Sequence, residues 1–162
     1  MPIGGGVVVE GIYDAYVCIR DKKAQGVSGG TFTVGAWQTR DLNDEVADTA
    51  NIASVSSNQI TLAAGTYVAL ILAPAHAVAN HQSRLYDITG GATLITGTPE
   101  YVGVTELVQT HSFVCGRFTL AATSVLEVQH YATSTKSANG LGIAGNITNE
   151  IYTVAQFWRE AS

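Results

Sequence analysis

Ser28 is the residue whose neighbours best suit covalent chemistry, in the stretch Gly26-Val27-Ser28-Gly29-Gly30. The stretch matches G-x-S-x-G, the nucleophile elbow that presents a catalytic serine between a buried strand and a helix. Here the charged run DKKAQ precedes the motif and the strand-like TFTV follows it. Neither flank fits an elbow, so the sequence predicts a flexible loop at this position.

A second glycine motif, Gly140-Leu141-Gly142-Ile143-Ala144-Gly145, matches the G-x-G-x-x-G pattern of dinucleotide sites. Such a site needs a strand immediately before the glycines and an acidic residue about 20 positions after them. The polar run STKSAN precedes this motif, and the sequence ends before that acidic position. We therefore expect a glycine-rich loop before a final strand, and no cofactor.

Histidine-based metal binding has little support in the spacing of the four histidines, which are His76, His81, His111 and His130. None has a partner at a metal-ligand spacing such as i, i+4. His130 shares strand parity with Leu126 and Val128, which predicts a buried, hydrogen-bonded imidazole. In a trimer the alternative is three copies of His130 around an ion on the axis. We expect no metal, because such a site also needs supporting residues that the sequence does not reveal.

The 13 acidic residues include no pair whose spacing marks it for glycoside hydrolysis. The two cysteines, Cys18 and Cys115, are predicted to be buried thiols in strands. We expect no enzymatic activity; the alternative is a hydrolase that uses a carboxylate pair at a subunit junction.

Composition limits the possible partners. The 162 residues suit one domain. Only 13% of them are charged, against about 25% in typical soluble domains, and 46% are hydrophobic. Part of the surface is therefore expected to be covered by copies of the same chain. With 8 basic against 13 acidic residues, the chain lacks the positive patch that a nucleic-acid partner requires.

The start MPIGGGVVVEG lacks the features of a secretory signal, and no apolar run approaches the ~20 residues that span a bilayer. We expect a product of the cytosol with no membrane partner. Residues 1–14 differ from the rest, with three glycines followed by Val7, Val8 and Val9. They predict an extended arm before a domain at 15–162. The arm is either a frayed end or a segment that adds to another protein's sheet.

Short runs rich in Val, Ile, Thr, Tyr and Phe alternate with glycine and asparagine turns throughout the chain. This pattern predicts an all-β antiparallel sandwich or jelly roll. The expected strands are 16–20, 31–34, 37–42, 59–62, 67–75, 82–88, 93–97, 113–120, 125–132 and 152–158.

The stretch GTYVALILAPA at 65–75 is apolar at both strand parities. Whichever parity faces the core, the other must also be removed from water. Some further layer is expected to cover it.

The segment NQITLAAGTYVALILAPAHAVANHQSRLYDITGG resembles the core of the tumour necrosis factor and complement globular-head superfamily of trimeric jelly rolls. The later pieces SFVCGRFTLAATSVLEVQHYATS and EIYTVAQFWRE are similar to the last strands of that fold. The resemblance covers about 31–160. It implies a homotrimer in which the long strand contacts the core on one side and two neighbouring subunits on the other.

A narrower resemblance concerns GAWQTRDLN, HQSRLYDI and LEVQHYA, which are similar to a version of this domain on tailed-bacteriophage surface proteins. It implies a non-enzymatic virion protein, made in the host bacterial cytoplasm and located on the virion surface. The first hypothesis is a knob that decorates or cements the capsid, with Val7, Val8 and Val9 attaching to the major capsid protein or another virion protein. The alternative is a tail-fibre or receptor-binding tip that recognises a host surface glycan, with Tyr101 as a candidate contact.

The resemblance and the strand parities together give an expected trimer interface. Its residues are Tyr67, Ile71, His130, Tyr131, Tyr152 and Phe157. The expected core residues are Leu70, Leu72, Phe118 and Val128.

Overall fold

Residues 11–162, the part of the chain that the computed structural model describes, form eleven β-strands and no helix. The strands are β1 (Tyr13–Lys23), β2 (Gln38–Thr39), β3 (Asp44–Asp48), β4 (Ala53–Ser56), β5 (Gln59–Leu62), β6 (Gly65–His76), β7 (Ala79–Asp87), β8 (Ala92–Val102), β9 (Gln109–Leu120), β10 (Ser124–Ala132) and β11 (Glu150–Glu160). The all-β prediction is confirmed. Within this part of the chain no helix could cross a membrane.

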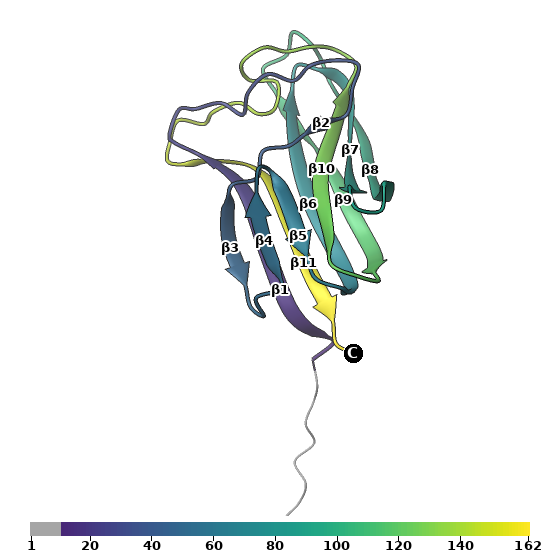
Figure 1. The fold of residues 1–162 in the computed structure, drawn as a ribbon. Coiled ribbons are helices and arrows are strands. Elements are labelled where there is room, and N and C mark those ends of the chain that lie inside the picture. Colours follow the sequence, from purple (N-terminus) through teal and green to yellow (C-terminus); the bar gives the residue numbers. More distant parts are fainter. Residues whose placement is uncertain (1–10) are drawn as a thin grey trace, which may run out of the picture.

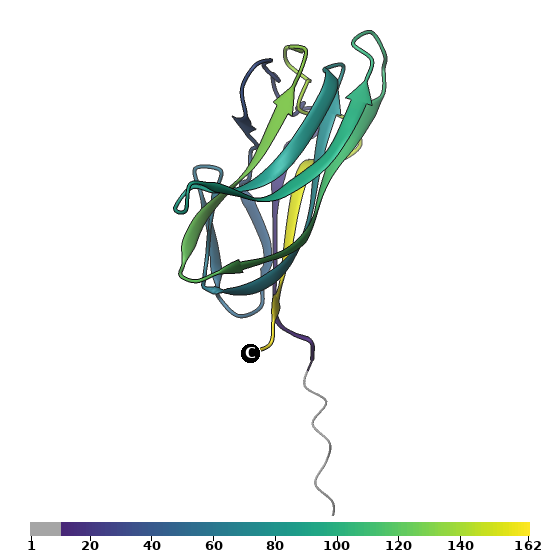
Figure 2. The same ribbon diagram turned by 90° about the vertical axis from the view of Figure 1, so that its right-hand side faces the viewer.

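The strands form two antiparallel sheets that pack as a jelly-roll sandwich (Figure 1). One sheet has the order β3-β1-β11-β6-β9. The other has the order β4-β5-β10-β7-β8, with the short β2 paired to β10. The first and last long strands are neighbours, so both described ends of the chain emerge at one end of the sandwich (Figure 2).

Local sequence explains the best predicted element. β4 and β5 are joined by Ser57 and Asn58, which have φ angles of 52° and 64°. Two positive φ angles are characteristic of the type I′ turn, whose twist matches that of paired strands. This turn sets the register, and β5 has the predicted bounds.

Three regions differ from the expected strands. Residues 31–34 make only one isolated bridge, between Phe32 and Lys136, and 37–42 contribute only the two residues of β2. Just after β2, the Arg40 amide still donates to the Val128 carbonyl of β10 at 2.8 Å, and the Arg40 side chain is fully buried. β3 and β4 were not predicted, since the acidic DEVAD and the small ASVS lack a clear strand pattern.

The main core lies between the sheets and contains Val17, Ile19, Leu42, Ile60, Leu62, Tyr67, Ala69, Ile71, Leu85, Val114, Phe118, Leu120, Leu126, Val128, Ala155 and Phe157. Phe118 and Val128 are confirmed as core residues. A smaller cluster around Phe32 and Leu141 fills the end of the sandwich that carries the long loops. Between the two clusters lies a group of buried polar side chains.

Candidate functional site

The outward side of the five-stranded sheet is a continuous surface of mostly apolar side chains, which we call the apolar face. Its members are Tyr16 and Cys18 on β1, Val154, Gln156 and Trp158 on β11, Val68, Leu70 and Leu72 on β6, and Phe113 and Cys115 on β9. Leu70 lies at its centre, in register between Gln156 and Cys115. Phe113 is 41% exposed although it is a large apolar side chain.

Charges in this region lie at the margins and are paired. Arg20 contacts Asp44 at 2.6 Å on the β1 side, and Arg117 contacts Glu160 at 2.6 Å on the β9 side. The centre carries no ionisable carboxylate or amine. A contiguous apolar patch of this kind is typical of a protein–protein interface.

The parity predicted for β6 is wrong by one residue. Tyr67, Ile71 and Phe157 are fully buried inside the chain's own core, so they do not belong to an intersubunit face. Leu70 and Leu72, expected in the core, point outward and are half-buried. Because successive side chains of a strand point to opposite faces, a slip of one residue exchanges the whole set.

The other three predicted interface residues also lie elsewhere. His130 is fully buried, and Tyr152 is buried with its hydroxyl donating to the carbonyl of Val27 at 2.8 Å. Tyr131 is half-buried on the outer side of the six-stranded sheet, with its ring 5.7 Å from that of Trp37. None of the six lies on the apolar face.

The cysteines lie on the apolar face, on strands separated by β11 and β6. Cys18, Gln156, Leu70 and Cys115 follow one another across the sheet. Three interstrand spacings of ~4.8 Å exceed the ~7 Å between Cα atoms that a disulfide can bridge. Both cysteines are free thiols. Cys18 is buried as predicted, whereas Cys115 is exposed and that prediction is wrong.

The most deeply buried charge is Arg40, whose side chain is fully enclosed. Its guanidinium donates to Thr153 Oγ1 at 2.8 Å, to the Pro74 carbonyl at 3.1 Å and to the Leu141 carbonyl at 2.7 Å. Burial lowers its pKa to about 10, and attraction to Asp21 limits the shift. Arg40 therefore stays charged at neutral pH and joins β6, β11 and the long loop before β11.

A pair of buried histidines lies near Arg40. His81 Nδ1 and His130 Nε2 are 2.9 Å apart, and His81 Nε2 lies 2.8 Å from Thr110 Oγ1. Burial, followed by repulsion from Arg40, lowers the pKa of His81 to about 4 and lowers that of His130 well below its usual value. Both rings are neutral at pH 7. The expected buried imidazole at His130 is confirmed.

This pair predicts a loss of stability in mild acid. The folded pKa of His81, about 4, lies below the usual 6.5. The unfolded chain therefore binds more protons as pH falls through 6.5, and stability is lost from there downward. We expect the free energy of unfolding to fall by up to ~1.4 kcal/mol per pH unit for each histidine between about pH 6.5 and 5. Urea unfolding across that range measures the slope, and a flat profile would contradict it. His130→Gln should make the profile shallower.

The two glycine motifs pack against each other and form no catalytic elbow. The Gly29 amide donates to the Gly142 carbonyl at 2.9 Å, and the Leu141 amide donates to the Gly30 carbonyl at 3.1 Å. A side chain at Gly142 would collide with the ring of Tyr152. These glycines thus allow two loops to approach closely. Ser28 Oγ accepts a long 3.4 Å contact from the Ala144 amide, as expected of a loop serine.

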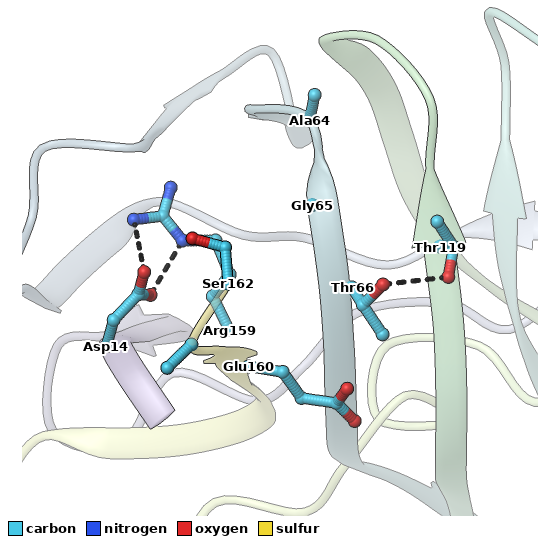
Figure 3. Close-up of a pocket in the computed structure, with 9 residues that line it drawn as sticks. Asp14, Ala64, Gly65, Thr66, Thr119, Arg159, Glu160 and Ser162 are labelled. Atoms are coloured by element: carbon cyan, nitrogen blue, oxygen red, sulfur yellow. Dashed lines mark hydrogen bonds and ion pairs between the residues drawn. The ribbon is translucent and has the colours of Figure 1, made fainter. Parts of the chain in front are cut away.

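A pocket of about 460 Å³ lies near the chain ends (Figure 3). Arg159 holds Asp14 at 2.7 Å on one side, and Arg117 holds Glu160 on the other. The hydrogen bond from Arg117 lowers the pKa of Glu160. A general acid in glycoside hydrolysis needs a raised pKa. These paired carboxylates therefore give the hydrolase alternative no support, and among residues 11–162 no cluster of three metal-ligating side chains occurs.

The predicted attachment residues Val7, Val8 and Val9 lie outside the described residues. β1 begins at Tyr13 and pairs there with Glu160, so the strand includes the last two residues of the expected arm at 1–14. Any arm that precedes this strand starts beside the C-terminal end of β11.

No family model and no curated protein sequence matches the chain. Solved structures do. Eiger TNF from S. frugiperda superposes with a TM-score of 0.60 at 14% identity, over 92% of this chain and 95% of that one. The chain has the TNF-like jelly-roll fold. The globular domain of zebrafish complement 1qA shares this TNF-like fold with a TM-score of 0.54 at 15% identity, over 91% and 96% of the two chains.

A virus protein with the TNF-like fold is also similar. The vertex protein P5 of PRD1 superposes with a TM-score of 0.52 at 11% identity, over 93% of this chain and all of that one. At these identities the comparisons establish the fold. The expected resemblance to the TNF and complement jelly rolls is thus confirmed for the fold.

Proposed function

We propose that the chain is a non-enzymatic virion structural protein, a homotrimeric knob that decorates or cements a bacteriophage capsid. The resemblance of GAWQTRDLN, HQSRLYDI and LEVQHYA to phage surface domains supports a virion role. The similarity in fold to a PRD1 vertex protein is consistent with it.

The apolar face is the main observation that supports the proposed trimer. In an isolated chain, Leu70, Leu72 and Phe113 would meet water together with the ring pair Tyr16 and Trp158, whose centroids are 5.3 Å apart. Stable oligomer interfaces of the obligate kind commonly bury ~2,000 Å² or more, with a more apolar composition than the remaining surface. Two further copies covering this face would make both sides of β6 dry.

Attachment to the capsid is assigned to the segment before β1. The strand begins at the end of the sandwich where β11 finishes (Figure 2). In a trimer about an axis along the sheets, the three segments would leave from one end. Val7, Val8 and Val9 are the proposed contacts to the major capsid protein, because an extended valine-rich segment suits strand addition to a sheet edge.

The mass in solution tests the assembly. Light scattering should give about three times 17.0 kDa for the full chain, and three chains for a version that starts at Gly11. A monomer at micromolar concentration would overturn the trimer. If the trimer formed only when residues 1–10 were present, the apolar face alone would not be sufficient as the interface.

Separating heads from tails of purified virions tests the location. Mass spectrometry should find the chain with the heads. Recovery with tails alone would favour the receptor-binding tip, and absence from virions would overturn both.

A further inference from the structure

A second, smaller pocket lies on the outer side of the six-stranded sheet, away from the apolar face. Its volume is about 190 Å³. The lining residues are Trp37, Asn80, His81, Gln82, Pro99, Tyr131 and Thr133. Trp37, the residue before β2, surrounds the pocket together with the end of β10, the start of β7 and Pro99 of β8, at the end of the sandwich opposite the chain ends (Figure 1). Pockets for drug-sized ligands typically have ~300–1,000 Å³, so this one suits a single ring.

Two aromatic side chains form one wall of the pocket. Trp37 is 36% exposed, and its ring meets that of Tyr131 at 62° with centroids 5.7 Å apart. Such amphipathic rings offer a large apolar contact and a polar edge in one rigid side chain. Tyr101, 62% exposed, lies beyond Asn80 in register on β8 and extends the aromatic surface.

The position of the indole is fixed from outside the pocket. The guanidinium of Arg84 lies 4.0 Å from the centre of the Trp37 ring and 4.5 Å from that of Tyr86. Arg84 also donates twice to Gln129 Oε1, at 2.9 and 2.7 Å. The cation is therefore held by the sheet, and cation–π attraction holds Trp37 in place before any ligand arrives.

Neutral polar groups form the opposite wall. The side-chain amide nitrogen of Gln82 donates to the Gly97 carbonyl at 2.8 Å, which fixes the amide. The backbone of Asn80 is held by Thr133 Oγ1 at 3.0 Å, and its side chain is exposed. The imidazole of His81 is buried, and its two nitrogens lie within hydrogen-bond distance of His130 and Thr110, so it offers no free polar group to the pocket. The lining thus combines aromatic rings, amides and a hydroxyl with no formal charge.

From this combination we infer that the pocket binds one neutral pyranose ring of a glycan. The C–H face of a pyranose is apolar and weakly positive, which complements the negative face of an aromatic ring. Its hydroxyl groups both donate and accept, as the side-chain amides of Asn80 and Gln82 do. The uncharged lining offers nothing to an anionic ligand, and the volume is too small for a larger one.

Three copies of this pocket would act together on a repetitive polysaccharide. One ring with few contacts is expected to bind with a Kd of about 1 mM or weaker. Linked sites on one trimer can strengthen the apparent affinity by ~10²–10⁴. The inference does not rest on the proposed capsid role, because single-site binding is a property of the isolated chain.

The chain contains two tryptophans, and only one lines the pocket, which gives the test an internal control. Indole N–H signals of Trp37 and Trp158 are followed by NMR during titration with methyl β-glucopyranoside, methyl β-galactopyranoside and N-acetylglucosamine up to ~100 mM, a range suited to millimolar affinity. Trp37 should shift saturably with at least one sugar while Trp158 stays in place. Cyclohexanol, a ring of similar size with one hydroxyl, should have no comparable effect.

Variants separate binding from folding. Tyr131→Ala should raise the Kd for the sugar, measured from the shift of the Trp37 signal, about tenfold or more, because half of the aromatic wall is lost. Tyr13→Ala, an aromatic truncation at the other end of the sandwich, should leave it unchanged. The inference is overturned if no sugar moves Trp37, if both tryptophans move alike, if cyclohexanol acts equally, or if Tyr131→Ala binds as well as the original chain.

Discussion

Leu70→Asp is expected to leave a folded chain that no longer assembles, with the mass in solution falling from three chains to one. Leu70 is at the centre of the apolar face and only half-buried within the chain itself, so a carboxylate there can reach solvent in a monomer. In a trimer the same carboxylate would be buried without a partner and close to its two copies. An unpaired buried charge costs roughly 3–5 kcal/mol per chain. Light scattering and circular dichroism measure mass and fold together.

Two control substitutions to Asp test whether the loss of assembly is specific to Leu70. Leu107→Asp makes the same replacement at a side chain that is 90% exposed, and should leave the trimer intact. Ile71→Asp changes the neighbouring position but places the charge in the core, so the chain itself should unfold. A trimeric Leu70→Asp would remove the apolar face from consideration as the interface.

Arg40→Leu should cause the second large effect, a loss of about 3–5 kcal/mol in the free energy of unfolding. The leucine fills much of the space but leaves Thr153 Oγ1 and the carbonyls of Pro74 and Leu141 without their donor. Each unsatisfied buried acceptor costs ~1–3 kcal/mol, partly offset by the removal of a buried charge. Urea unfolding at pH 7 measures the change.

Arg40→Lys distinguishes the role of the charge from that of the planar fork. Lysine keeps the charge but cannot reach three acceptors that lie in the directions set by a guanidinium. We expect it to lose most of the same stability. Full stability in the lysine variant would mean that charge alone matters at this position, and an unaffected leucine variant would contradict the three-acceptor account.

Most of the fold could be predicted from the sequence, since turn residues and runs of β-branched residues mark strands directly. β5 illustrates this, because Asn58 tolerates the positive φ that a tight hairpin needs. The acidic edge strand β3 was missed because its residues carry no alternation of apolar and polar types. The two residues of β2 are held by a partner strand rather than by their own propensity.

The candidate site could be predicted from the sequence only in part. The two apolar parities of 65–75 indicate that the strand has an apolar side chain on both faces of the sheet. They do not show which parity faces the core, because the usual criterion, a difference in hydrophobicity between the two faces, is absent here. Ile71 and Leu70 are equally apolar, and only the structure shows which is outside. The inward turn of Arg40 and the contact of Trp37 with Tyr131 join segments about 90 or more residues apart, which no local pattern encodes.

The pairing of Tyr13 with Glu160 has a practical consequence for protein engineering. The Ala161 amide donates to the Ile12 carbonyl at 3.0 Å, so the two ends of the folded region are already in contact. A short peptide could join them into a closed ring, and new termini could be opened in an exposed turn such as Gly90-Gly91 without disturbing either sheet. A circularly permuted chain of this kind would carry any genetically fused cargo at the opened turn.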